Sequence, residues 1–119
     1  MAHPLGARYH IPHGVVCGLL LPYTMEYNLD YAQAKYAHVA ALLGEPVAGL
    51  PEREASVCGI DRVRALLREM AIPEHLAPFG LQPAGFDEII AESLPSGSLK
   101  HNPRRLAAED VRAILQAEL

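Results

Sequence analysis

The sequence predicts an all-helical fold, a bundle of about five helices formed by a single domain that spans residues 1–119. A chain of 119 residues suits one domain, because domains usually contain about 100 to 150 residues. Half of the residues are hydrophobic, which supplies enough apolar surface to offset the entropy lost on ordering. The apolar residues are mostly Ala and Leu, which are good helix formers, whereas Val, Ile and Thr are few and no segment has a convincing strand pattern.

The first predicted helix begins near residues 12–14 and continues to about Tyr27. Its apolar residues cover nearly the whole circumference, which is typical of a central buried helix. Pro22 has no N–H to donate to the carbonyl of Gly18, so we expect the helix to bend there. The apolar residues of this helix are Val15, Val16, Leu19, Leu20, Leu21 and Tyr23.

A second helix is expected after Asn28 or Asp30, either of which can cap its N-terminus. Gly44 is placed to end it. Its apolar residues recur at spacings of four, three and four, so they share one helical face that we expect to lie in the core. They are Ala32, Tyr36, Val39 and Leu43.

The third helix is predicted to start at Pro51, which suits the first helical position, and to extend toward Pro73. Glu52 and Glu54 fall in its first turn, where the helix macrodipole favours anions. One apolar stripe is expected to pack against the other helices. That stripe contains Val57, Ile60, Val63, Leu67 and Met70.

Two further helices are expected in the last third of the chain. A short fourth helix ends near Leu94, and a connection over residues 95–103 follows it. The last helix spans about residues 107–117. The fourth helix is marked by Phe86, Ile89 and Ile90, and the last helix is expected to bury Val111, Ile114 and Leu115.

Charge and hydropathy exclude several classes of protein. Ten Lys and Arg against fourteen Asp and Glu give a net charge of −4, which disfavours a nucleic-acid partner. The longest apolar stretch, residues 14–22, is under half of the roughly 20 residues that a membrane span needs, and no secretory leader precedes it. Cys17 and Cys58 lack CxxC spacing, so we expect reduced thiols in a cytoplasmic protein without a membrane segment.

Three of the six histidines, His3, His10 and His13, lie within the first thirteen residues. Histidine is a common ligand of zinc and iron and titrates near neutral pH. His10 and His13 share a helical face only if a helix continues through Pro12, so the sequence disfavours a metal site formed by these two residues. A small zinc site built on all three histidines remains an alternative. His13 lies at the N-terminal end of the first predicted helix, where a rigid element would hold its ring beside a cleft.

Other motifs of catalytic sites are missing from the sequence. The glutamates fall on separate predicted helix faces, so no paired catalytic carboxylates are indicated. The segment 95–98 lacks the pattern of a phosphate-binding loop, and no dinucleotide fingerprint is present. The basic cluster Lys100, Arg104 and Arg105 is either an anion site or a solvated loop.

Two motifs surround the histidines: AHPLG at residues 2–6 and PHGV at residues 12–15. This pair resembles the signature of iron-containing (group III) alcohol dehydrogenases. The resemblance continues through LPYTMEYN at residues 21–28 and NPR at residues 102–104, and it covers essentially the whole chain. It implies a truncated helical domain like the C-terminal domain of dehydroquinate synthase. The N-terminal nucleotide-binding α/β domain of the family has no counterpart in the sequence.

The resemblance also implies roles for two residues. His13 matches the last metal-ligating histidine of the family, and His3 matches a histidine near the nicotinamide and the substrate that is not a ligand. The family holds Fe²⁺, or sometimes Zn²⁺, with one Asp and three His, and the other three ligands would lie before Met1. Because one ligand of four remains, we expect neither metal nor NAD(P) to bind this chain alone. No residue of the chain is assigned to the NAD(P) cofactor.

The implied activity is reversible hydride transfer between NAD(P)H and a small alcohol or aldehyde, with the metal as Lewis acid. The chain would supply one metal ligand and one wall of the substrate cleft, and would be inactive without the missing N-terminal nucleotide-binding domain. The alternative is a stand-alone helical interaction module that forms a homo-oligomer through exposed apolar patches. One departure from the family concerns stability: Ala107 replaces the Thr or Ser that often caps the last helix.

Overall fold

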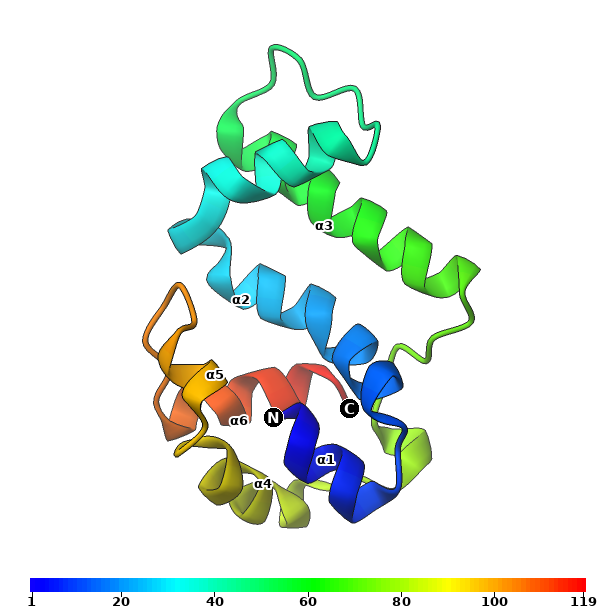
Figure 1. The fold of residues 1–119 in the computed structure, drawn as a ribbon, viewed down its shortest axis with the longest axis vertical. Helices are drawn as coiled ribbons and strands as arrows, with labels where there is room; N and C mark the ends of the chain where they lie inside the picture. Colours follow the sequence, from blue (N-terminus) through cyan, green and yellow to red (C-terminus); the bar gives the residue numbers. More distant parts are fainter.

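A computed structural model describes residues 1–119 and confirms the all-helical prediction, with no strand in the chain. It contains six α-helices and two short 3₁₀ turns, η1 and η2 (Figure 1). In chain order the elements are α1 (Ala2–Tyr9), α2 (His13–Leu42), α3 (Glu52–Glu69), η1 (Ala77–Phe79), η2 (Pro83–Gly85), α4 (Phe86–Ser93), α5 (Gly97–Lys100) and α6 (Ala108–Ala117).

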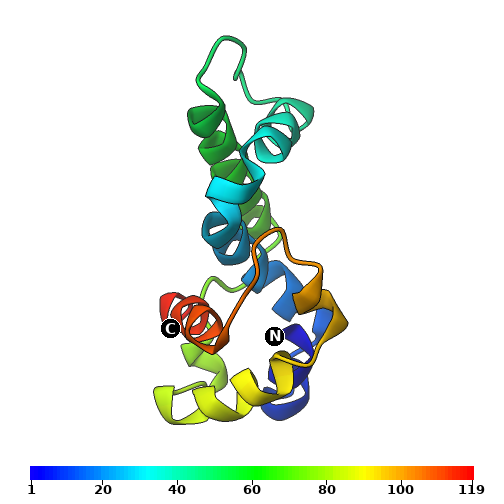
Figure 2. The same cartoon turned by 90° about the vertical axis from the view of Figure 1, so that its left-hand side faces the viewer.

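The helices form an elongated molecule of 44 × 30 × 21 Å. The second half of α2 and the antiparallel α3 make an arm at the top of Figures 1 and 2. Helices α1, α4, α5 and α6 gather at the other end around the first half of α2, and both chain termini lie there. The candidate site residues of the N-terminal segment therefore belong to the compact end of the molecule.

The main hydrophobic core lies in this compact end. Phe86 is its largest buried side chain, with 1% of its surface exposed. The three residues that the sequence predicted to be buried in α6 are buried, so that prediction is confirmed. The three apolar residues that marked α4 are buried as well. The core contains Leu5, Ile11, Val16, Leu19, Leu20, Leu76, Leu81, Phe86, Ile89, Ile90, Val111 and Leu115.

Helix α1 is absent from the sequence prediction, which started the first helix near residue 12. Pro4 and Gly6 disfavour a helix by propensity, but Pro4 stands in the first turn, where its missing N–H breaks no helical hydrogen bond. Leu5 and Pro4 are buried against the core, and this packing stabilises the helix. The helix ends at His10 in the left-handed conformation, with φ of 54°.

The first two predicted helices are one element, α2. Its one residue with non-helical dihedral angles is Ala32, at φ −141° and ψ 21°. The helix is therefore kinked at Ala32 rather than at Pro22. The expected separation at Asn28 or Asp30 is thus displaced by a few residues. The prediction that this face lies in the core is only partly right, because Ala32 is buried but Tyr36, Val39 and Leu43 are half-buried.

The apolar stripe predicted for α3 is partly wrong. Ile60 is buried, but Val57 and Met70 are 40% and 62% exposed. In the first half of α3 the face that meets α2 carries small residues instead, and a Cβ atom at Gly59 would lie only 2.7 Å from the carbonyl oxygen of Tyr36, whereas Leu67 of the predicted stripe does approach α2. Since the two backbones approach this closely, hydrophobicity alone misplaces the buried face. Its buried residues are Ala55, Ser56, Gly59 and Ile60.

Helix α6 begins at Ala108, with Ala107 as its N-cap residue. The methyl side chain of Ala107 offers no acceptor to the helix. The Asp110 carboxylate compensates in part, because it accepts a hydrogen bond of 2.7 Å from the Ala107 N–H.

No helix of the fold is both long enough and apolar enough to cross a membrane.

Candidate functional site

His3 and His13 line one hollow of about 620 Å³ at the compact end of the molecule. His3 lies in the first turn of α1, and His13 is the first residue of α2. Both side chains are exposed. The turn at residues 10–12 joins the two helices and brings the two histidines to the same wall. The other lining residues are Met1, Ala2, Pro4, Cys17, Glu92, Ser93, Pro95, Ser96 and Ser98.

His13 also contacts Cys17, which lies one helical turn later on the same face of α2. The Nε2 atom of His13 is 3.4 Å from the Sγ atom of Cys17. Cys17 is an exposed free thiol, whereas the other free thiol, Cys58, is half-buried on α3. The sequence predicts only that Cys17 is a reduced thiol, because its position at this hollow depends on the helical register of α2.

The third clustered histidine does not join this wall. His10 is exposed in the left-handed turn that ends α1 and does not line the hollow. No three His, Cys, Asp or Glu side chains of the chain converge in a way that holds a metal ion. The alternative of a zinc site built on His3, His10 and His13 is therefore wrong.

The donor chemistry of the hollow fits part of a metal site. An exposed imidazole nitrogen suits divalent iron or zinc, and His13 is held by the rigid start of α2. Metal sites in proteins use about four converging ligands, so His13 fits as one ligand among others that this chain does not supply.

The far wall of the hollow comes from the end of α4 and from the connection after it. Glu92 is tied to α1, because the Arg8 guanidinium donates a hydrogen bond of 3.0 Å to its carboxylate. The Ser93 hydroxyl donates to the carbonyl oxygen of Ile89, at 2.7 Å. Ser96 and Ser98, to which the sequence gave no role, add polar side chains to this wall.

Polar contacts fix the connection 95–103 against α2. Asn28 is buried, and its amide exchanges two hydrogen bonds of 2.7 Å with the amide of Asn102. Asn102 also donates to the carbonyl oxygen of Arg104, and the Arg104 guanidinium lies 4.3 Å from the ring centre of Tyr27. These residues belong to the sequence motifs at 21–28 and 102–104, and their geometry gives them a structural role.

A carboxyl group is buried beside the chain termini. Glu118 has no exposed surface, and neither of its carboxylate oxygens has a hydrogen-bond partner. Burial raises the pKa of Glu118 to about 8, and the charge of the Met1 amine acts in the opposite direction. Burial lowers the pKa of that amine. A residue next to the last position of the sequence gave no signal that it would be buried.

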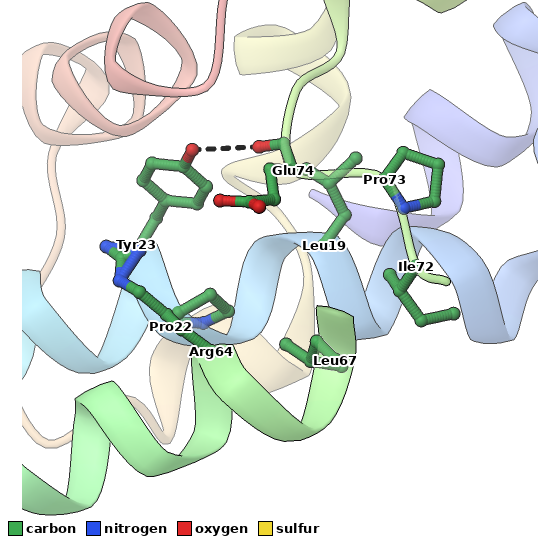
Figure 3. A pocket seen from close by; sticks show the side chains of 8 residues that line it. All are labelled: Leu19, Pro22, Tyr23, Arg64, Leu67, Ile72, Pro73 and Glu74. Carbon is green, nitrogen blue, oxygen red and sulfur yellow. Dashed lines mark hydrogen bonds between the residues drawn. The ribbon is translucent and has the colours of Figure 1, made fainter. Parts of the chain in front are cut away.

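A much smaller crevice lies between α2, α3 and the segment after α3, where these elements pack against one another. The Tyr23 hydroxyl donates to the carbonyl oxygen of Glu74 at 2.8 Å, and the Arg64 guanidinium lies 5.0 Å from the centre of the Tyr23 ring (Figure 3). The free space in the crevice is about 10 Å³, room for one water molecule and not for a substrate. It is lined by Leu19, Pro22, Tyr23, Arg64, Leu67, Ile72, Pro73 and Glu74.

Comparison with known proteins assigns the family. Residues 1–119 match the C-terminal part of the Fe-containing alcohol dehydrogenase family. The chain belongs to this family. The sequence resemblance drawn from the motifs at residues 2–6 and 12–15 is thereby confirmed over the whole chain.

Curated members of the Fe-containing alcohol dehydrogenase family include close relatives of the chain. Lactaldehyde reductase of Escherichia coli K12 is 38% identical over 111 residues, which cover 93% of this chain and 29% of that protein. The 1,3-propanediol dehydrogenase of Klebsiella pneumoniae is 35% identical, with 98% of this chain and 30% of that protein covered. The chain thus spans about 30% of the length of the curated relatives that it matches.

Solved structures agree with this fold. A 1,3-propanediol oxidoreductase superposes with a TM-score of 0.95 at 33% identity, covering 99% of this chain and 31% of the other. An alcohol dehydrogenase from Oenococcus oeni superposes with a TM-score of 0.94 at 37% identity, with the same coverage. The helical arrangement around His3 and His13 is therefore that of the C-terminal part of a Fe-containing alcohol dehydrogenase.

Proposed function

We propose that the chain acts as the C-terminal helical domain of an iron-dependent, NAD(P)-linked alcohol dehydrogenase. In this role it supplies one metal ligand and one wall of the substrate cleft. The observation that carries the proposal is that His3 and His13, which stand on different helices, line one hollow of about 620 Å³. Family membership over residues 1–119 supplies the reaction class.

His13 is the metal ligand in this proposal. Its imidazole is exposed at the first residue of a 30-residue helix, so the backbone that carries it is held rigidly. Iron, or zinc, bound with the help of this nitrogen supplies a Lewis acid for the oxygen of the substrate. The chain contributes the position and the direction of one ligand, and the remaining ligands come from the rest of the enzyme.

His3 has a different role, because it is proposed to face the substrate without binding the metal. Its imidazole is exposed on α1 at the same hollow. The two ring nitrogens of an imidazole donate or accept hydrogen bonds, so His3 can orient the substrate hydroxyl or exchange a proton with it.

The hollow favours small polar alcohols and aldehydes as substrates. Ser96, Ser98 and Glu92 line the wall opposite the histidines, and these side chains offer hydrogen-bonding atoms to a hydroxyl group. The related proteins named lactaldehyde reductase and 1,3-propanediol dehydrogenase support the same substrate class. The NAD(P) cofactor is bound by the part of the enzyme that these relatives have beyond the matched third.

The test is activity after the chain is joined to a cofactor-binding domain. The chain is fused to the segment of E. coli lactaldehyde reductase that precedes its matched part, and alcohol oxidation is followed by NADH absorbance. We expect turnover from the fusion and none from the isolated chain. The proposal fails if the isolated chain oxidises an alcohol with NAD or NADP.

One variant of the fusion tests the role of His3, and a second variant serves as its control. His3→Ala is expected to keep the metal and lower kcat by roughly a hundredfold or more, as for loss of a group that transfers protons. His10→Ala is the matched control, since His10 is exposed close by but does not line the hollow. Equal activity of the His3→Ala and His10→Ala fusions would remove the role given to His3.

Exposed apolar side chains favour a second candidate function, a helical interaction module that self-associates. Tyr31, Leu42 and Met70 are each more than 60% exposed on α2 and after α3. Unpaired apolar surface of this kind marks interaction sites when it is contiguous. Sedimentation of the isolated chain tests this candidate: concentration-dependent dimers or larger species support it, and a monomer at high concentration excludes it.

A further inference from the structure

Most cations of the chain are neutralised by a carboxylate, and the exceptions are unevenly placed. Lys35, Lys100 and Arg105 make no ion pair and donate no side-chain hydrogen bond within the chain. Lys35 lies on α2, whereas Lys100 and Arg105 lie close together in the sequence around the end of α5. The cations that do pair are Arg8, Arg53, Arg62, Arg64, Arg68, Arg104 and Arg112.

Lys100 and Arg105 line one hollow of about 510 Å³. The hollow has no acidic lining residue, so nothing in its wall neutralises the two cations. It shares no lining residue with the hollow of His3 and His13. Its other lining residues are Leu94, Leu99, Asn102 and Leu106.

The apolar part of this hollow is built from three leucines on separate elements. Leu94 follows α4 and is 36% exposed, Leu99 lies in α5, and Leu106 precedes α6 with 8% of its surface exposed. Asn102 fixes the segment between them, because its side-chain oxygen and nitrogen are both hydrogen-bonded to the amide of Asn28. Apolar surface and unpaired positive charge are therefore held side by side on an anchored backbone.

We propose that this hollow binds a small organic anion with an apolar tail, such as a medium-chain monocarboxylate. Lys100 and Arg105 complement the charge of the carboxylate, and Leu94, Leu99 and Leu106 cover the tail. A volume of about 510 Å³ lies within the range of small-molecule sites.

The same features disfavour larger polyanions. Two unpaired cations suffice for one anionic group but are too few for a polyanion. The net charge of −4 also repels a nucleic acid or an extended acidic surface. Inorganic phosphate would use the cations but leave the leucines in water. The combination of one anionic head and an apolar tail is the ligand chemistry that uses both parts of the hollow.

The experiment is a titration of the uniformly ¹⁵N-labelled chain followed by amide chemical shifts. The probes are octanoate, octanol, inorganic phosphate and vesicles that contain an anionic lipid. We expect octanoate to shift the amides of residues 94–106 with a dissociation constant in the high micromolar to millimolar range, as for a ligand of about ten heavy atoms. Octanol and phosphate each lack half of the recognised chemistry and are expected to bind more weakly.

Charge variants test the role of the two cations. Lys100→Gln and Arg105→Gln are each expected to weaken octanoate binding roughly fivefold, as for loss of an exposed ion pair, and the double variant more than either. Lys35→Gln is the matched control, because it removes an equally unpaired cation on α2, outside the hollow. Higher salt is expected to weaken octanoate binding to the unmodified chain.

Three results would overturn the proposal. One is equal binding of octanol and octanoate, which would make the site merely apolar. Another is octanoate binding that the double variant leaves unchanged, or that Lys35→Gln weakens as much. The third is a response to anionic vesicles alone, which would assign these cations to a membrane surface. The proposal is independent of the dehydrogenase function, because no residue of the hollow of His3 and His13 takes part in it.

Discussion

The buried carboxyl group of Glu118 gives the chain a stability that depends on pH. Its side chain is fully buried without a hydrogen-bond partner, and burial raises its pKa from 4.5 to about 8. The folded chain therefore holds a proton on Glu118 at pH values where the unfolded chain has released it. Replacing Glu118 with Gln keeps the shape of the side chain and removes this titration.

The sign and the size of the effect follow from proton linkage. The raised pKa stabilises the folded chain fully below about pH 4.5, and this stabilisation is lost as the pH rises to about 8. A difference of about 3.5 pH units in pKa corresponds to at most about 5 kcal/mol of unfolding free energy. The Met1 amine reduces the effect, because its positive charge favours the ionised carboxylate.

Urea unfolding followed by circular dichroism at pH 5, 7 and 9 measures this effect, since the chain has no Trp for fluorescence. The unfolding free energy of the unmodified chain should fall from pH 5 to pH 9 by several kcal/mol more than that of Glu118→Gln. Glu109→Gln, which changes an exposed carboxylate on α6, is the control and should behave like the unmodified chain. Parallel pH profiles of the unmodified chain and Glu118→Gln would refute the reasoning.

Three further substitutions test packing and capping. Ala107→Ser should raise the unfolding free energy by about 1 kcal/mol, because a hydroxyl completes the cap that Asp110 begins, and thermal unfolding measures it. An unchanged midpoint would contradict this role. Gly59→Ala should cost about 1 to 3 kcal/mol, since its Cβ would lie 2.7 Å from the Tyr36 carbonyl oxygen; no loss in urea unfolding would exclude the close approach of α2 and α3. Phe86→Ala should cost about 3 to 5 kcal/mol, and a cost below 1 kcal/mol would show that Phe86 is not central to the core.

Apolar spacing predicts the helices whose buried faces carry large side chains. Val111, Ile114 and Leu115 on α6 are buried as the sequence predicts. Apolar spacing does not predict a buried face where two backbones pack directly against each other, as at Gly59 in α3, because small residues give no hydrophobic signal. It also misses α1, since helix propensity penalises Pro4 although the first turn of a helix tolerates it.

The site was predictable to the extent that it is encoded in local motifs. His3 and His13 stand in the two motifs that identify the family, and they do line one hollow. Cys17 and Ser98 were not assigned to it, because their approach depends on the register of α2 and on the folding of residues 95–103 against it. Residues that meet only through tertiary structure leave no pattern in the sequence.

The iron content of the fusion with the N-terminal segment of lactaldehyde reductase tests the role of His13 most directly. Elemental analysis after purification should find about one iron or zinc ion per polypeptide in the fusion and in its His10→Ala variant. The His13→Ala variant should have lost most of its metal while keeping the helical circular dichroism spectrum. Full metal content in the His13→Ala variant would contradict the assignment of His13 as a ligand.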